Sequence, residues 1–278
     1  MPNTDTLRPP AIHDDSVAVA SIAALAFIFA DLAHEGLGHG LGFYFAGGKS
    51  SMLTTTRLIT WITLPNPQWR MFDLGGPAGN LALALVAWLA LRSSRARPVQ
   101  LKFFLWLVMA FSLFWAFGYL IFSGVTGRGD WMALITGTRM LAIGRVLFVL
   151  IGIALYRFSL RFLASELRKT FPGGESSTQA RLSRLIWLSY IFGGLIACAG
   201  AILDPRGAIE ILKSGALSSF GAAVGLLAIP AVYSRLPQPQ GSLHQPVSRH
   251  LAWILAAAAA SIYYIAILGP GILMWFGN

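Results

Sequence analysis

The segment from residue 16 to 45 constrains the fold of this chain more than any other feature of the sequence. It is largely apolar, but Asp31, His34, Glu35 and His39 interrupt it in its second half. About 20 apolar residues are enough to cross a bilayer as a helix. Ionisable side chains inside such a segment are costly to insert and mark functional sites. The sequence therefore predicts a membrane-spanning helix that carries a functional site.

The composition indicates that most of the remaining chain is also membrane-embedded. Of the 278 residues, 56% are hydrophobic and only 12% are charged, whereas about 25% of the residues of a soluble domain are charged. We expect an all-α, multi-pass bundle of about six or seven transmembrane helices in a cell's inner or plasma membrane. The fourth span is the weakest, because Arg139 and Arg145 interrupt it. The candidate spans are 16–45, 74–91, 103–125, 138–157, 185–203, 211–233 and 250–275.

The stretch from Met52 to Leu64 has a different character. It is rich in Thr, Ile and Leu, and it lies between Gly47-Gly48 and Pro65. Such residues between turn-forming residues favour short strands. We expect one or two strands here, which would form a small β-hairpin after the first helix.

The positive charge of the chain bears on its topology. The net charge is +10, and the basic residues lie in short loops between apolar spans. We therefore expect contacts with lipid headgroups and none with nucleic acid. With seven spans, an inside N-terminus places more than half of the 21 lysines and arginines on the inside. The positive-inside rule favours that orientation.

His34, Glu35 and His39 have the composition of a zinc site with its general base. In the usual zinc helix the histidines are four residues apart, whereas here they are five apart. At about 100° per residue, a regular helix would point them about 140° apart. A one-residue π-bulge would return both to one face, and Gly36 and Gly38 make the stretch deformable; these glycines would equally allow close helix packing. In a regular helix, Glu35 and His39 would share a face instead, and His34 would point elsewhere.

The motif His34-Glu35-Gly36-Leu37-Gly38-His39 resembles the His-Glu-x-x-His motif of the site-2 protease family of intramembrane metalloproteases, with one residue inserted. Its spacing is similar to the zinc helix of the dipeptidyl peptidase III family, which implies that it can bind zinc. Gly76-Pro77-Ala78-Gly79-Asn80 resembles the first family's Gly-Pro-x-x-Asn element. The resemblance extends from Ser16 to Trp131. It implies a catalytic membrane core over residues 1–131, followed by additional transmembrane helices of unknown role over 132–278.

The third zinc ligand of that family is an aspartate near the end of a third core helix. By order along the chain, the resemblance points to Asp130, which directly follows the third span. The family's Asn-Pro…Leu-Asp-Gly pattern is absent there. Asp204, in Leu203-Asp204-Pro205, is locally closer to that pattern but lies two spans later. Asp73, just before the Gly-Pro element, is a further alternative.

The resemblance implies an intramembrane zinc metalloprotease that hydrolyses a peptide bond in or near a transmembrane segment of a membrane-protein substrate. Zinc would be held by His34, His39 and Asp130, with Glu35 as the general base. Asn80 would donate a hydrogen bond to the oxyanion, or would only join two helices. The alternative functions are a catalytically inactive membrane binding protein of the same fold, and a transporter that relays protons or metal ions.

Asp31 lies three residues before His34 and four before Glu35, so the three side chains can share a helix face. Two roles are open for it. Its carboxylate would either hold the second nitrogen of a ligand histidine, as carboxylates near metal sites commonly do, or lie in water at the membrane boundary.

Overall fold

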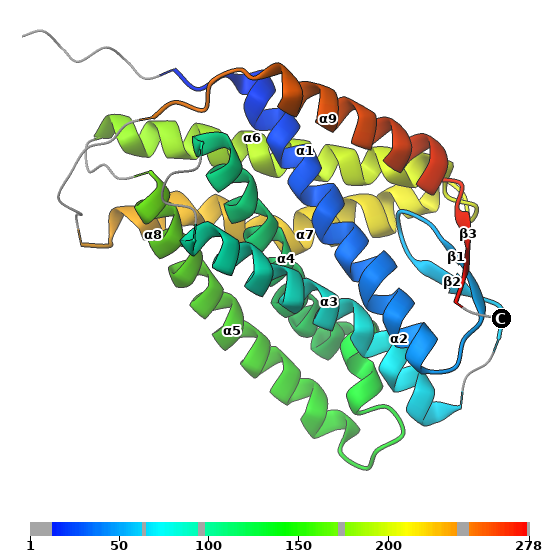
Figure 1. Cartoon of the computed structure of the whole chain (residues 1–278). Coiled ribbons are helices and arrows are strands. Elements are labelled where there is room, and N and C mark those ends of the chain that lie inside the picture. The colour runs from blue at the N-terminus through cyan, green and yellow to red at the C-terminus, as the bar shows by residue number, and fades with distance from the viewer. Residues whose placement is uncertain (1–12, 63–64, 94–97, 172–175, 238–244, 277–278) are drawn as a thin grey trace, which may run out of the picture.

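Long apolar helical segments form a bundle in the computed structural model (Figure 1). The structure describes residues 13–62, 65–93, 98–171, 176–237 and 245–276. The expected all-α bundle is confirmed, and its segments suggest a multi-pass membrane protein. Within the described ranges, the seven segments long and apolar enough to cross a membrane are Ser16–Phe45, Pro67–Arg92, Val99–Thr126, Leu141–Thr170, Gln179–Leu203, Ile211–Ser234 and Leu251–Leu268.

The helical elements follow one another along the chain, with α for α-helices and η for π- and 3-10 helices. The first segment consists of α1 (Ser16–Leu32), η1 (Ala33–His39) and α2 (Gly40–Phe45). The chain then passes back and forth between two ends of the bundle, the N-terminal end with Ser16 and the sheet end with three strands (Figure 1). The later helical elements are α3 (Asn66–Arg92), α4 (Val99–Thr126), η2 (Asp130–Leu134), α5 (Leu141–Thr170), α6 (Ser176–Gly200), η3 (Ala201–Leu203), η4 (Ile211–Ser218), α7 (Ser219–Ala223), η5 (Val224–Ala228), α8 (Ile229–Ser234), α9 (Leu251–Tyr263) and η6 (Tyr264–Leu268).

Several expected spans have different bounds in the structure: the fourth ends at Thr170 and not at residue 157, and the fifth begins at Ser176 and not at residue 185. The second, α3, begins at Asn66 and not at residue 74, because Pro67 suits the first turn of a helix. The last helical segment ends at Leu268 and not at residue 275. Gly271 there takes a φ of +100°, which turns the chain into a strand.

The weak fourth span is a full-length helix, α5. Its Arg145 does not break the helix, because the guanidinium donates to two carbonyls near the end of α4. These are the carbonyls of Gly124 at 2.9 Å and Val125 at 2.6 Å. A cation whose donors meet the free carbonyls of a helix C-terminus is favourably placed, so this arginine joins the two helices.

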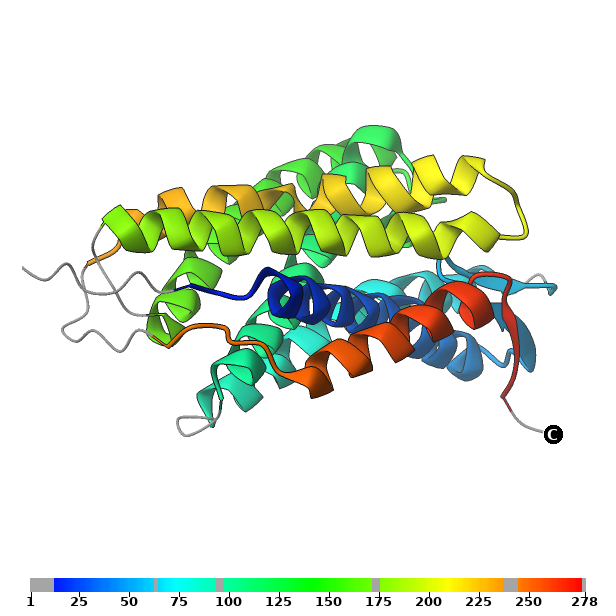
Figure 2. The same cartoon turned by 90° about the horizontal axis from the view of Figure 1, so that it is seen from above.

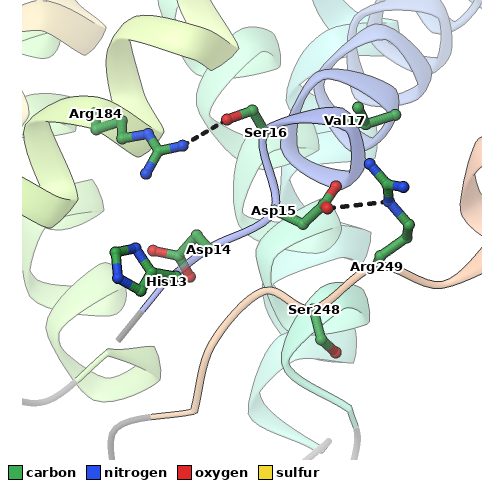
Figure 3. A pocket seen from close by; sticks show the side chains of 8 residues that line it. All are labelled: His13, Asp14, Asp15, Ser16, Val17, Arg184, Ser248 and Arg249. Atoms are coloured by element: carbon green, nitrogen blue, oxygen red, sulfur yellow. Dashed lines mark hydrogen bonds and ion pairs between the residues drawn. The ribbon is translucent and has the colours of Figure 1, made fainter. Parts of the chain in front are cut away.

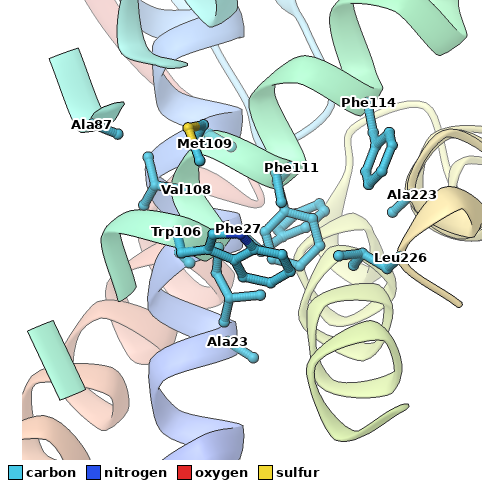
Figure 4. Packing of buried hydrophobic residues seen from close by; sticks show 14 of the residues in the cluster. Ala23, Phe27, Ala87, Trp106, Val108, Met109, Phe111, Phe114, Ala223 and Leu226 are labelled. Atoms are coloured by element: carbon cyan, nitrogen blue, oxygen red, sulfur yellow. The ribbon is translucent and has the colours of Figure 1, made fainter. Parts of the chain in front are cut away.

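The first helix lies in the middle of the bundle and packs against α4, α6 and α9 (Figures 1 and 2). Phe27 meets Phe111 and Trp115 edge-on, with ring centroids 5.7 and 5.1 Å away. The indole N–H of the fully buried Trp106 donates to the carbonyl of Leu163 at 2.9 Å. Figure 4 shows Phe27, Trp106 and Phe111 in this cluster. In a bilayer, close packing and hydrogen bonds hold helices together, so α1 is fixed from several sides.

Short strands close the sheet end. β1 (Ser50–Leu53) and β2 (Leu58–Thr60) form an antiparallel hairpin, which confirms the expected one. The N–H of Thr54 donates to the carbonyl of Arg57 at 3.0 Å and closes the turn. β3 (Ile272–Trp275) pairs antiparallel with the other side of β1, which the sequence did not predict. The order is therefore β2-β1-β3, and β2 and β3 form the edges.

Ion pairs join the segments at the N-terminal end. Asp15 caps α1, because its Oδ1 accepts the N–H of Ala18 at 2.9 Å. Asp14 binds the guanidinium of Arg181 through both carboxylate oxygens, at 2.6 and 2.7 Å. Arg249 donates to Asp15 at 3.0 Å. Asp14, Asp15 and Arg249 line a hollow at this end (Figure 3), where each of the two carboxylates is matched by an arginine.

Candidate metal centre

The five-residue spacing of the two histidines is accommodated by a π-helix. This element, η1, runs over Ala33–His39, so the chain makes one wider turn between α1 and α2. The imidazoles of His34 and His39 are both buried, and their ring centroids lie 4.9 Å apart. The expected bulge is therefore confirmed. The alternative, a regular helix in which His34 points away from His39, does not form.

A glycine turn after α4 brings Asp130 to both imidazoles. Gly127 and Gly129 take φ angles of +69° and +95°, which glycine adopts without strain. Asp130 follows as the first residue of η2. Its Oδ2 lies 3.1 Å from Nε2 of His34 and 3.4 Å from Nε2 of His39. The turn thus places the carboxylate of Asp130 in contact with both histidines.

These three side chains fit a zinc ion. Zinc bonds of about 2.0–2.2 Å at tetrahedral angles separate ligand atoms by about 3.3–3.6 Å, which is close to both contacts of Asp130. Both lie within ion-pair distance but lack the direction of a hydrogen bond, so the buried Oδ2 has no hydrogen-bond partner among the described residues. Two imidazoles and a carboxylate are also a ligand set of catalytic zinc.

The charges around Asp130 keep it ionised. Burial on its own raises the pKa of this carboxyl group, but the neighbouring His39 and His34 outweigh burial and hold the pKa below its usual range. A carboxylate must be deprotonated to bind a metal ion. Asp130 is therefore in the form that a metal ligand requires.

The backbones of α3 and η1 pack closely beside the Nε2 atoms of the two histidines. A Cβ atom on Gly38 would lie 2.8 Å from Cα of Gly76, and one on Gly79 would lie 3.0 Å from Cα of Gly38. The two backbones thus touch through glycines, as at other small-residue interfaces of membrane helices. A Cβ atom on Gly76 would lie 2.5 Å from Nε2 of His39 and 2.7 Å from Nε2 of His34. The packing role expected for the glycines of this stretch is therefore confirmed for Gly38, and their role in permitting the bulge stays a prediction.

Each imidazole is held through its other ring nitrogen by α3. Nδ1 of His39 lies 2.8 Å from the carbonyl oxygen of Phe72. Because a carbonyl only accepts, this nitrogen carries a proton. Nδ1 of His34 lies 3.3 Å from the amide nitrogen of Asn80. The structure thus places Asn80 against a ring of the site, and its predicted bond to an oxyanion stays a prediction.

Glu35 belongs to the same cluster. One carboxylate oxygen and one ring nitrogen of each histidine lie within 4.8 Å of one another. Oε2 of Glu35 accepts the backbone N–H of Leu58 at 3.1 Å. Since Leu58 is the first residue of β2, an edge strand of the sheet fixes the carboxylate that the sequence predicts to be the base.

Both roles considered for Asp31 are wrong. Its carboxylate is buried, and it accepts a hydrogen bond from the hydroxyl of Tyr264 at 2.9 Å. The second nitrogens of the two histidines are taken by Phe72 and Asn80. The Tyr264 hydroxyl also lies 3.3 Å from the carbonyl oxygen of Thr55, so Asp31 links the first helix to the last helical segment and the hairpin.

The two alternatives to Asp130 have different surroundings. Asp204 is held by Arg206 at 3.1 Å and by the hydroxyl of Thr56. This carboxylate braces the hairpin turn and has its own cation. Asp73 follows Phe72 in α3, is half-buried, and interacts electrostatically with Asp130. Of the three candidates, the structure gives ion-pair contacts with both imidazoles only to Asp130, among the residues that it describes.

Sequence reasoning missed three groups of the site. The ring of Tyr119 in α4 stands edge-on to that of His34, with centroids 6.2 Å apart, and this residue interacts electrostatically with Asp130 and Glu35. The carbonyl of Phe72 and the N–H of Leu58 are backbone groups, which leave no signal in side-chain patterns. Tyr119 had a signal, because it is one of the few polar residues in the expected span 103–125.

Comparison of the chain with protein-family models, curated proteins and solved structures gives no match. The function proposed below therefore rests on the geometry of the site.

Proposed function

We propose that the chain is an intramembrane zinc metalloprotease that hydrolyses a peptide bond in or near a transmembrane segment of a membrane protein. One observation carries the proposal: His34, His39 and Asp130 converge, with the carboxylate of Glu35 beside them. Three ligands and one further carboxylate are the combination that hydrolytic zinc enzymes use. The apolar helices around the site support a substrate from the membrane.

The residues of the site have distinct roles in this hydrolysis. A zinc ion held by the three side chains would polarise the scissile carbonyl and make water a better nucleophile. The carboxylate of Glu35 accepts a proton from the attacking water and returns it to the leaving amide nitrogen. The N–H of Leu58 holds this carboxylate in place. The carbonyl of Phe72 holds His39 so that Nε2 points toward Asp130.

The sheet supports an extended substrate. β1 is covered by β2 and β3, so the positions for another strand are the two outer edges. β2 is the edge whose first residue, Leu58, reaches Glu35. A substrate strand that adds to β2 through main-chain hydrogen bonds would bring its carbonyls beside Glu35. A transmembrane helix uses its backbone groups internally, so the substrate would unwind locally before it binds.

The test uses purified protein, its zinc content and cleavage of a model transmembrane substrate. Wild-type protein should hold about one zinc ion per chain. Glu35→Gln should keep the zinc but lower the cleavage rate by about 10²- to 10⁴-fold, the usual contribution of a general base. His34→Ala should lose the zinc. The reverse pattern, with zinc lost in Glu35→Gln and kept in His34→Ala, would contradict the proposal.

The same measurements separate the alternative functions. A protein that binds zinc but cleaves no membrane substrate would be an inactive binding protein. A protein without zinc, in which the histidines share a proton with Asp130, would favour the relay function.

A further inference from the structure

The two histidines of the site differ in what faces their second nitrogen. Nδ1 of His39 faces a carbonyl oxygen, that of Phe72, so in the neutral ring, the form that binds a metal ion, Nδ1 carries the proton and Nε2 keeps a lone pair. Nδ1 of His34 faces the NH₂ group of Asn80, which can only donate. To accept this hydrogen bond, Nδ1 needs its lone pair, and the proton of the neutral ring then lies on Nε2. A protonated Nε2 cannot bind zinc, so this orientation of the amide suits only the metal-free site.

The other atom of the same amide has no partner. Asn80 is fully buried, and no described residue donates a hydrogen bond to its Oδ1. A buried acceptor without a donor is costly. A half-turn about the Cβ–Cγ bond exchanges the oxygen and the nitrogen with almost no change in shape. Oδ1 would then face Nδ1 of His34 and accept its N–H.

We propose that Asn80 is the positioning residue of His34. Its carbonyl oxygen accepts the Nδ1 proton, and this directs the lone pair of Nε2 to the zinc ion. The inference rests on the proposed function, since it requires that zinc binds at His34. Asn80 then acts on His34 as the carbonyl of Phe72 acts on His39, and both supports belong to α3. The helix that packs through glycines against η1 thus sets the orientation of both rings.

The test compares two substitutions in the full-length protein, purified in detergent and loaded with zinc. Asn80→Leu keeps the size of the side chain but removes the acceptor. Asn80→Asp presents an oxygen in either orientation. Competition with a chromophoric chelator measures the dissociation constant of zinc. Loss of a group that supports a metal ligand weakens metal binding by about 10- to 100-fold, and we expect this in Asn80→Leu, with affinity at least equal to the wild type in Asn80→Asp.

The control is Gln100→Met. It removes another buried amide, which donates to the hydroxyl of Ser248 at 2.9 Å, at the N-terminal end of the bundle. This variant should bind zinc as the wild type does. Wild-type zinc affinity in Asn80→Leu would overturn the inference, and so would equal weakening in Asn80→Leu and Asn80→Asp.

A second measurement does not depend on how the variants fold. Nitrogen-15 NMR of labelled histidine in the zinc-loaded wild type reports which ring nitrogen of His34 carries the proton. We expect the proton on Nδ1, and a proton-free Nδ1 would overturn the inference. If the wild type binds no zinc, the proposed function fails together with the inference. If it binds zinc and Asn80→Leu binds equally well, only the inference fails.

Discussion

The two ends of the helix bundle hold buried carboxylates in different ways. At the N-terminal end, Asp14 meets donors on every side: Arg181 binds both oxygens, and the N–H of Val247 donates to Oδ1 at 2.7 Å. At the sheet end, Asp130 faces two imidazoles, and its Oδ2 lacks a hydrogen bond from any described residue. The first arrangement neutralises its own charge and serves stability. The second would be satisfied by a cation shared with the two imidazoles, as the proposed zinc site requires.

The largest expected effect is the loss of metal from the sheet end. Asp130→Ala should reduce zinc from about one ion per chain to almost none, because two ligands remain of three. Asp14→Ala removes a carboxylate that is at least as buried from the other end and should leave the zinc in place. Asp204→Ala should do the same, since Arg206 and Thr56 hold that carboxylate. Mass spectrometry of the purified variants measures the bound zinc and tests these three expectations. Loss of zinc in Asp204→Ala, with retention in Asp130→Ala, would reverse the assignment of the third ligand.

The N-terminal end should respond in stability and not in metal content. Arg181→Met leaves Asp14 buried without its partner, and such a break costs about 3–5 kcal/mol. Arg249→Met is the matched control, because its side chain is 63% exposed, and exposed pairs contribute about 0–1 kcal/mol. Thermal unfolding should therefore shift clearly in the first variant and little in the second, with zinc bound in both. A loss of zinc in Arg181→Met would mean that the two ends are not independent.

The close packing of Gly76 against the two imidazoles can be tested with one added methyl group. In Gly76→Ala, the new Cβ would lie 2.5 and 2.7 Å from the two ligand nitrogens. Overpacking costs about 1–3 kcal/mol, so zinc should bind about 5- to 150-fold more weakly. Gly221→Ala adds the same methyl group to α7, where a Cβ meets no atom within 4 Å, and should change nothing. Unchanged zinc affinity in Gly76→Ala would show that the rings can move away.

The smallest expected effect concerns Tyr119. A Cβ on Gly129 would lie 3.0 Å from its hydroxyl, so this group stands beside the turn that carries Asp130. Among the described residues, no hydrogen bond engages the hydroxyl, which leaves it free to donate to a substrate oxygen. A hydrogen bond of this kind contributes about 0.5–1.5 kcal/mol. Tyr119→Phe should therefore lower kcat by up to about tenfold while zinc affinity stays the same. A change in zinc affinity instead would assign Tyr119 to the metal and not to the substrate.

The local features of the site could be predicted from the sequence. The five-residue spacing of His34 and His39 predicts the π-helix, because no regular helix turns both rings to one side. The resemblance of the motifs, applied to the order of spans, points to Asp130 rather than Asp204, and the structure brings Asp130 to both rings. The Thr- and Ile-rich stretch predicts the hairpin that supplies Leu58. In each case, neighbouring residues or the order of helices decide the geometry.

Features that depend on contacts between distant segments could not be predicted from the sequence. Residues 272–275 continue an apolar run, and only their pairing with β1 makes them a strand and not the end of a helix. Asp31 and the hydroxyl of Tyr264 are 233 positions apart, so no local pattern joins them. The bond between Asn80 and His34 depends on how closely α3 approaches η1, which glycines permit but do not specify.

The late position of β3 in the chain has a consequence for biosynthesis. Leu53 of β1 pairs with Ile272, about 220 residues later. At about 5–20 residues per second, the ribosome needs about 10–40 s to make the intervening chain. During that interval the outer edge of β1 is open, and the carboxylate of Asp31 lacks the hydroxyl of Tyr264. The helix that carries Glu35 is therefore synthesised first but reaches its final surroundings last, when the C-terminal segment has been made.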